Sequence, residues 1–100
     1  MAQIKYCRIK ITVDSVHGTC PLGNKPGREF LIERTTPAGM CLSAFHTLGP
    51  AIQVLRYGGR FPWEKDPDTA YVACPDHINR CVFRLERAGE LVFHASQDHA

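Results

Sequence analysis

Residues 4–13 read Ile-Lys-Tyr-Cys-Arg-Ile-Lys-Ile-Thr-Val, and apolar side chains alternate there with polar ones. A period of two residues predicts a strand with one face buried and the other exposed. Every second residue from Cys7 to Val13 falls on the apolar face, whereas Tyr6 falls on the opposite face. Cys7 is therefore expected to act as a small buried hydrophobic residue.

Three further strands and a helical segment follow along the chain. The strands are expected at residues 29–34, 69–74 and 80–87. Apolar residues at helical spacing predict a helix over residues 40–57, which Gly49-Pro50 breaks or kinks. The order β-β-α-β-β indicates a small α+β domain. It would have two antiparallel hairpins and a central helix laid across a sheet or a partial barrel.

Composition and charge exclude several classes of protein. Of the 100 residues, 44% are apolar and 22% charged, as in globular domains and unlike disordered, coiled-coil or collagen chains. The net charge of +2 is too near balance to favour a nucleic-acid partner. No apolar run of about 18 residues is present, so no membrane span is expected. Residues 1–10 lack a hydrophobic signal core, which predicts a cytoplasmic protein.

The domain is expected to cover residues 1–88, followed by a tail at residues 89–100. The tail contains the short apolar patch Leu91-Val92-Phe93. This patch fits either an extra strand or an arm that docks on another subunit. We therefore expect a homo-oligomer.

Five cysteines are the unusual feature of the composition. Their odd number and the absence of a Cys-x-x-Cys pair argue against a disulfide framework and a local zinc knuckle. Cys7 and Cys81 lie on the apolar faces of predicted strands and are assigned to packing. The candidates for a functional site are Cys20 in a Gly/Pro-rich loop, Cys41 in the first helical turn and Cys74 at a strand end.

Among these three, Cys41 is the best candidate for a nucleophile or a ligand, because a helix N-terminus favours a thiolate. A buried thiol on the helix's apolar face is the alternative. Asp76 and His17 are the candidate proton carriers. A turn cap for Asp76 and a solvated loop residue for His17 are the simpler interpretations.

Other residues suggest how a ligand would be held. Lys25 and Arg60 would hold an anionic group, and Trp63 would supply an aromatic wall. The stretch around Trp63 also fits a hydrophobic plug that closes the core. Alternatively, a zinc or iron centre would use the thiolates of Cys20, Cys41 and Cys74, with His46 or His77 as the fourth ligand.

Four motifs together resemble a family of small, largely uncharacterised microbial proteins. They are Cys20-Pro-Leu-Gly-Asn-Lys-Pro-Gly27, Pro37-Ala-Gly-Met-Cys41-Leu-Ser-Ala44, Gly58-Gly-Arg-Phe-Pro-Trp63 and Cys74-Pro-Asp76. The resemblance covers residues 4–87 and implies that the family's pattern includes the three candidate cysteines.

The chain departs from that pattern at two positions. Asn24 stands where the pattern has histidine, and Arg28 stands where it has an acidic residue. Asn24 can hydrogen-bond a substrate but cannot titrate. These departures put a metal site of three cysteines and one histidine in doubt.

These observations favour a small-molecule enzyme, a lyase, decarboxylase or hydrolase acting on a small aromatic or carbonyl acid. Its pocket would be formed by the Cys20 loop, the start of the Cys41 helix, Trp63 and the Cys74-Pro-Asp76 turn. The alternatives are a zinc or iron–sulfur protein on the same thiols and a non-catalytic interaction module. A site at a subunit interface is plausible for so small a domain.

Overall fold

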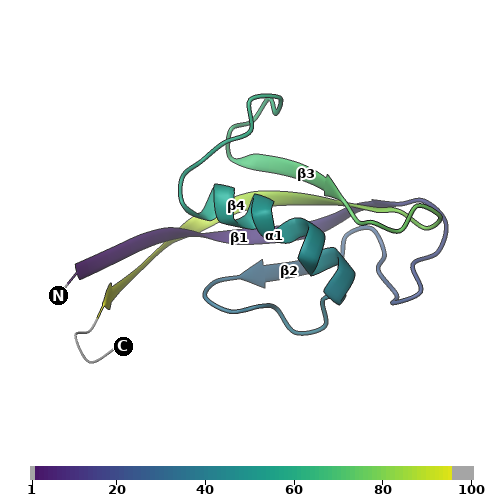
Figure 1. Cartoon of the computed structure of the whole chain (residues 1–100), viewed down its shortest axis with the longest axis horizontal. Helices are drawn as coiled ribbons and strands as arrows, with labels where there is room; N and C mark the ends of the chain where they lie inside the picture. Colours follow the sequence, from purple (N-terminus) through teal and green to yellow (C-terminus); the bar gives the residue numbers. More distant parts are fainter. Residues whose placement is uncertain (1, 96–100) are drawn as a thin grey trace.

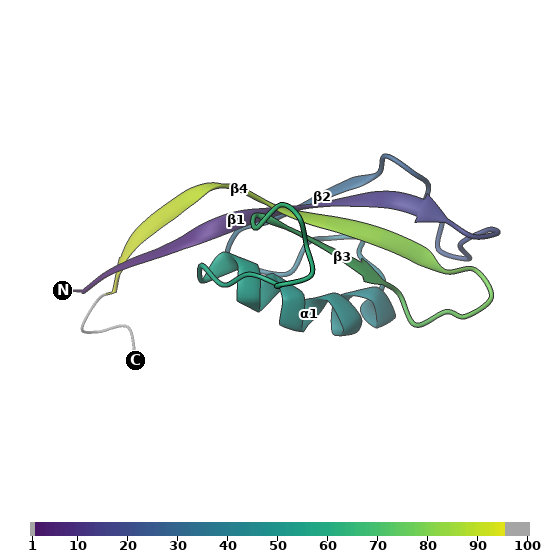
Figure 2. The same cartoon turned by 90° about the horizontal axis from the view of Figure 1, so that it is seen from above.

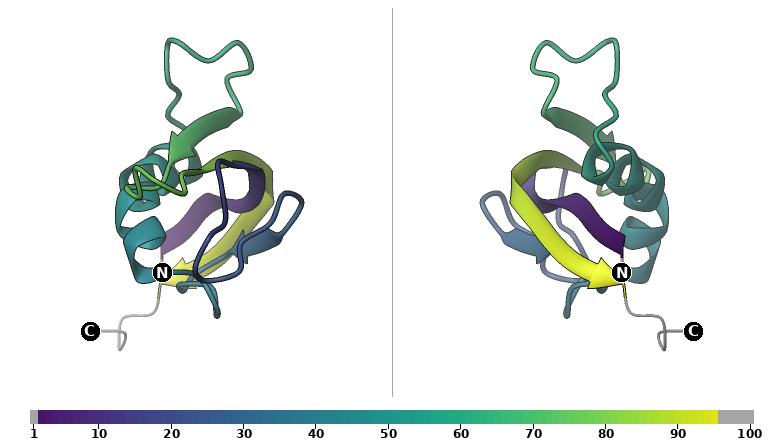
Figure 3. Two further views of the ribbon diagram at one scale, coloured as in Figure 1. Left: turned by 90° about the vertical axis from the view of Figure 1, so that its right-hand side faces the viewer. Right: turned by 90° about the vertical axis from the view of Figure 1, so that its left-hand side faces the viewer.

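An open antiparallel sheet with a helix on one face forms the part of the chain that the computed structural model describes, residues 2–95 (Figure 1). Its elements are β1 (Ala2–Val16), β2 (Glu29–Ile32), α1 (Leu42–Arg56), β3 (Thr69–Ala73) and β4 (Cys81–Ala95). The strand order across the sheet is β2-β1-β4-β3, and Figure 3 shows α1 to one side of the strands. The predicted α+β class and element order are confirmed, with a sheet that is not closed.

The core lies between α1 and the sheet. Strands β1 and β4 each direct a row of side chains toward the helix because of their alternation. On the helix side, residues spaced by three or four positions form the matching stripe. The fully or almost fully buried members are Ile9, Ile11, Val13, Leu48, Leu55, Cys81, Phe83 and Leu85.

A bulge in β4 interrupts its pairing with β1. Cys7 pairs with Glu90 and Ile9 pairs with Arg87, so two residues of β4 stand opposite Arg8 and the extra residue belongs to β4. Tyr6, just before this shift, is buried on the helix side, where the guanidinium of Arg56 stands 4.3 Å from its ring centroid. The prediction that Tyr6 opposes the apolar face was wrong.

Strand β4 continues through the position where a tail was expected to begin. Gly89 adopts a φ of +108° next to the register shift, a conformation that favours glycine. The strand then pairs with β1 as far as Ala95, and this ribbon extends beyond α1 (Figure 2). Leu91-Val92-Phe93 therefore belongs to β4 and not to an extra strand, and residue 88 is not a strand end. Docking of the tail on another subunit stays a prediction, and residues 96–100 lie outside the described part.

Helix α1 runs through Gly49-Pro50 as one element, so of the predicted break or kink the break does not occur, and a kink stays a prediction. Proline removes the N–H that would bond the carbonyl four residues earlier. Pro50 and His46, the residue that carries that carbonyl, are both exposed, so water can take the place of the missing donor. The helix has 15 residues. No helix in the described part of the chain is long and apolar enough to cross a membrane.

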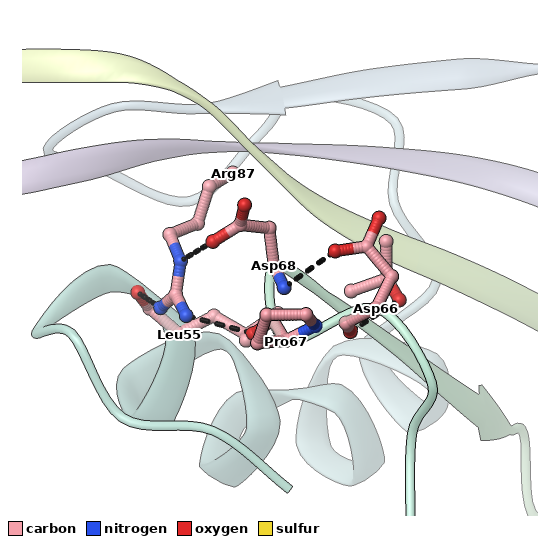
Figure 4. Close-up of polar contacts among 6 residues, drawn as sticks. Leu55, Asp66, Pro67, Asp68 and Arg87 are labelled. Carbon is pink, nitrogen blue, oxygen red and sulfur yellow. Dashed lines mark hydrogen bonds and ion pairs between the residues drawn. The ribbon is translucent and has the colours of Figure 1, made fainter.

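Arg87 of β4 joins three parts of the fold (Figure 4). Its guanidinium donates to the Leu55 carbonyl at 2.6 Å, to the Pro67 carbonyl at 2.8 Å and to Asp68 Oδ1 at 2.8 Å. Cations favour helix C-termini because the free carbonyls there carry partial negative charge. Arg87 thus fixes the end of α1 opposite to Cys41.

Candidate functional site

A cavity of about 380 Å³ lies at one end of the sheet. It is enclosed by the loop after β1, the N-terminus of α1 and the turn between β3 and β4, which meet at the same end of the molecule in Figures 1 and 2. Among its lining residues are four of the five cysteines: Cys20, Cys41, Cys74 and Cys81. The structure therefore brings together the three cysteines singled out from the sequence and adds one more.

Cys81 is the member that sequence reasoning missed. Its side chain is 1% exposed and packs in the core, as the strand pattern predicted. Cys81 is also the first residue of β4 and borders the cavity. Its position opposite Cys74 follows from the hairpin, since the residues before and after a turn face one another. That pairing is the sequence signal that could have identified it.

The loop around Cys20 surrounds its sulfur with N–H donors. Gly23, with a φ of +81°, donates its N–H to the Cys20 carbonyl at 3.0 Å and closes a turn. Burial is the largest single influence and raises the pKa of the Cys20 thiol. Interactions with the backbone N–H groups of Asn24 and Leu22 and with the side chains of Cys81 and Asn24 together outweigh it and lower the pKa. Cys20 is therefore a thiolate at lower pH than a free cysteine, and the thiolate is the nucleophilic form.

Asn24 and Arg28, the two departures from the resembled pattern, contact one another. Asn24 is only 6% exposed, and its Oδ1 accepts from Arg28 Nη1 at 3.1 Å. The guanidinium also donates to the Gly39 carbonyl at 3.3 Å and lies 4.7 Å from the Phe30 ring centroid. Arg28 thereby ties the Cys20 loop to the turn before α1.

Cys74 and Cys81 are paired at the end of the β3–β4 hairpin. Cys74 donates its N–H to the Cys81 carbonyl at 2.8 Å, and Cys81 donates its N–H to Cys74 Sγ at 3.2 Å. Burial, together with the neighbouring sulfurs of Cys20 and Cys74, raises the pKa of the Cys81 thiol to about 12. Cys81 is therefore a neutral hydrogen-bond donor at neutral pH.

Asp76 lines the cavity but caps its own turn. Its Oδ1 accepts the N–H groups of Ile78 at 2.9 Å and Asn79 at 3.1 Å, and these bonds lower the pKa of the carboxyl. Asn79 in turn accepts the N–H of Thr19 at 3.2 Å, which links this turn to the Cys20 loop. The turn-cap interpretation is thus observed, and an ionised Asp76 is poorly suited to donate a proton.

Cys41 is the N-cap residue of α1 and borders the same cavity. Its side chain makes no capping hydrogen bond, whereas its carbonyl accepts the N–H of Phe45 at 2.9 Å. The predicted position at the helix start is confirmed. Its role as nucleophile stays a prediction.

Six predicted site residues do not line this cavity. Trp63, 72% exposed, lines a separate hollow of about 230 Å³ beside α1 and β3, on the loop that projects from the molecule in Figure 3. The expected pocket shared by Trp63 and the cysteines is therefore not formed. His46 lines another shallow hollow. The remaining four are exposed and are absent from the cavity wall: His17, Lys25, Arg60 and His77.

The thiols do not form a metal site. Within the residues that the structure describes, no three His, Cys, Asp or Glu side chains are arranged to hold a metal ion. The zinc or iron centre expected on Cys20, Cys41, Cys74 and His46 thus does not fit this arrangement.

Comparison with known proteins adds no relative. No family model, curated protein or solved structure matches the chain. The resemblance drawn from the four motifs therefore stays a prediction, and the function is inferred from the cavity itself.

Proposed function

We propose that the protein is a small-molecule enzyme in which the Cys20 thiolate attacks the carbonyl carbon of a small acid derivative. The observation that carries this proposal is a cysteine whose sulfur receives several hydrogen bonds at the wall of a cavity of about 380 Å³. Covalent catalysis by cysteine requires the thiolate, and N–H donors directed at the sulfur favour it.

The lining of the cavity indicates the kind of substrate. Leu22, Ala44 and Phe83 supply apolar wall, while Ser43 and Asn79 supply polar groups. A volume near the lower end of ligand pockets, roughly 300–1,000 Å³, suits a ligand with one aromatic ring or a short chain. This supports the small aromatic or carbonyl acids expected from the sequence.

The groups that could donate a proton limit the class of reaction. Asp76 is held ionised and His17 lies off the cavity wall, so the site offers neither as a proton donor to a leaving group. Attack by a thiolate needs no base. The C–S bond forms, the carbon–oxygen bond of an activated ester breaks, and the alcohol component leaves as an anion. Water then cleaves the thioester and regenerates the thiolate. Among the expected reactions, hydrolysis of an activated ester therefore suits the site best.

A burst assay with p-nitrophenyl acetate tests the proposal. We expect rapid release of about one equivalent of p-nitrophenolate per chain as the acyl group is transferred to sulfur, followed by slower turnover. The burst should disappear in Cys20→Ser and persist in Cys7→Ser, a control outside the cavity. A burst that survives Cys20→Ser, or that is lost only in Cys41→Ser, would overturn the assignment of Cys20.

A further inference from the structure

Three thiols form a continuous group beneath the cavity, with Cys81 in the middle. Cys20, Cys74 and Cys81 all line the cavity, and interactions with the side chains of Cys20 and Cys74 contribute to the raised pKa of Cys81. Cys74 Sγ accepts the backbone N–H of Cys81 at 3.2 Å, and Cys81 Sγ donates to the Asn79 carbonyl oxygen at 3.9 Å. A sulfur that can be oxidised thus lies beside a second thiol.

We infer that Cys20 is a site of oxidation by small hydroperoxides, and that Cys81 captures the oxidised sulfur to form a Cys20–Cys81 disulfide. This inference does not depend on the ester chemistry proposed above, because it requires only the contact between the two thiols and access of a small oxidant to Cys20.

The chemistry balances with hydrogen peroxide as the oxidant. The Cys20 thiolate attacks one peroxide oxygen, the O–O bond breaks, and hydroxide leaves, giving a sulfenic acid. The Cys81 thiol gives up its proton and its sulfur attacks Cys20, forming the S–S bond as the S–O bond breaks and water departs. The two thiols lose two electrons in total, which reduce both peroxide oxygens. A dithiol reductant reverses the step.

The surroundings of the two cysteines favour Cys20 as the oxidised thiol and Cys81 as the thiol that captures it. The cavity wall makes Cys20 accessible to a molecule as small as peroxide. Cys81 is buried, which protects it from direct oxidation. The Cys20 thiolate also contributes to the raised pKa of Cys81, after burial. Conversion of that thiolate into a neutral sulfenic acid removes its charge and eases deprotonation of Cys81.

The arrangement of the cavity favours Cys81 over the other cysteines. Cys20 and Cys81 share the cavity wall and their side chains interact, whereas Cys74 Sγ accepts the backbone N–H of Cys81 at 3.2 Å. A disulfide needs sulfurs about 2.05 Å apart, so Cys20 must move toward the sheet. Its loop contains Gly18 and Gly23 in positive-φ conformations, which gives that segment flexible points.

Peroxide treatment followed by mass spectrometry tests the inference. Reduced protein is exposed to hydrogen peroxide, alkylated with N-ethylmaleimide under denaturing conditions and digested. We expect a peptide pair linked through Cys20 and Cys81, loss of two of the five alkylation sites, and full recovery after dithiothreitol. A Cys20–Cys74 link, or unchanged alkylation at peroxide levels that oxidise a free cysteine peptide, would overturn it.

Variants separate the two roles. In Cys81→Ser the sulfenic acid should persist and be trapped by dimedone at Cys20, and Cys81→Ala provides an apolar replacement if the serine disturbs the core. In Cys74→Ser the disulfide should still form, whereas a dimedone adduct there would contradict the role of Cys81. The ester burst is measured on the same reduced samples. A disulfide without a burst refutes only the proposed enzyme, and a burst without a disulfide refutes only this inference.

Discussion

Replacing Arg28 with alanine is expected to destabilise the protein by about 2 kcal/mol. The charged hydrogen bond to buried Asn24 contributes about 1.5 kcal/mol, at the low end for such bonds because Arg28 is only half buried. The cation–π contact over Phe30 adds about 0.5 kcal/mol. The 3.3 Å bond to Gly39 is exposed and replaceable by water. For a domain of this size, the loss lowers Tm by about 8–16 °C.

Urea unfolding followed by circular dichroism measures this loss. Lys25→Ala is the matched control, because it removes the same charge from an exposed residue of the same loop and should change stability by less than about 0.5 kcal/mol. Arg28→Ala should also slow the labelling of Cys20 at neutral pH, since Asn24 helps to hold its sulfur as a thiolate. The reasoning is refuted if the two variants unfold at the same urea concentration and label at the same rate.

Three further predictions concern the pKa values of Cys20 and Asp76 and the hydrogen bonds of Arg87. Burial opposes ionisation of Cys20, but the N–H groups of Asn24 and Leu22 lower its pKa below 9.0, so iodoacetamide should label it at pH values where a free cysteine peptide is still slow; coincident pH profiles would contradict this. The N–H groups of Asn79 and Ile78 lower the pKa of Asp76 below 3.8. The stability that these hydrogen bonds provide is therefore fully present above pH 3.8, and it is lost as the pH falls through the pKa that the carboxyl has in the folded protein. Asp76→Asn should therefore be less stable than wild type at neutral pH, and urea unfolding at several pH values should show the gap closing in acid; a gap that is constant with pH argues against it. Arg87→Lys keeps the charge but loses the three hydrogen bonds to Leu55, Pro67 and Asp68. The free energy of unfolding should fall by about 2–3 kcal/mol, which thermal unfolding measures. A Tm equal to that of the exposed control Arg60→Lys would count against this role of Arg87.

Periodic patterns predicted the elements wherever one face of a segment is buried along its whole length. The alternation of residues 9–13 and the helical stripe up to Leu55 both have this property. The patterns failed where the backbone departs from its period. Tyr6 lies toward the helix beside the register shift, and Gly89, which belongs to the bulge, allows β4 to continue rather than end. Neither event changes the hydrophobicity of the residues involved, so composition and spacing carry no signal for it.

The candidate site was predictable in part for a related reason. Cys20, Cys41 and Cys74 lie beside the ends of helices and strands, and in this topology those ends meet at one end of the sheet. Cys81 was assigned to packing because it lies on the core face, yet a residue at the first position of a strand can belong to the core and border a cavity. The grouping of Trp63 with the cysteines rests on its aromatic character, on Arg60 nearby in the sequence and on the motif that contains both. The path of its loop toward the other end of α1 depends on tertiary contacts such as those of Arg87.

Asn24 and Arg28 are the two departures from the resembled pattern, and the contact between them bears on the chemistry of the cavity. Residues four apart in a loop have no fixed spatial relation, so the sequence presents two separate substitutions, while the structure shows one hydrogen-bonded pair. The pair holds Asn24 where its backbone N–H and its side chain reach the Cys20 sulfur. Asparagine cannot transfer a proton, but stabilising a thiolate requires only donors. A cavity with a stabilised thiolate and no histidine among the described residues of its wall is therefore suited to reactions whose leaving group departs as an anion. The activated ester and the peroxide both have such a leaving group.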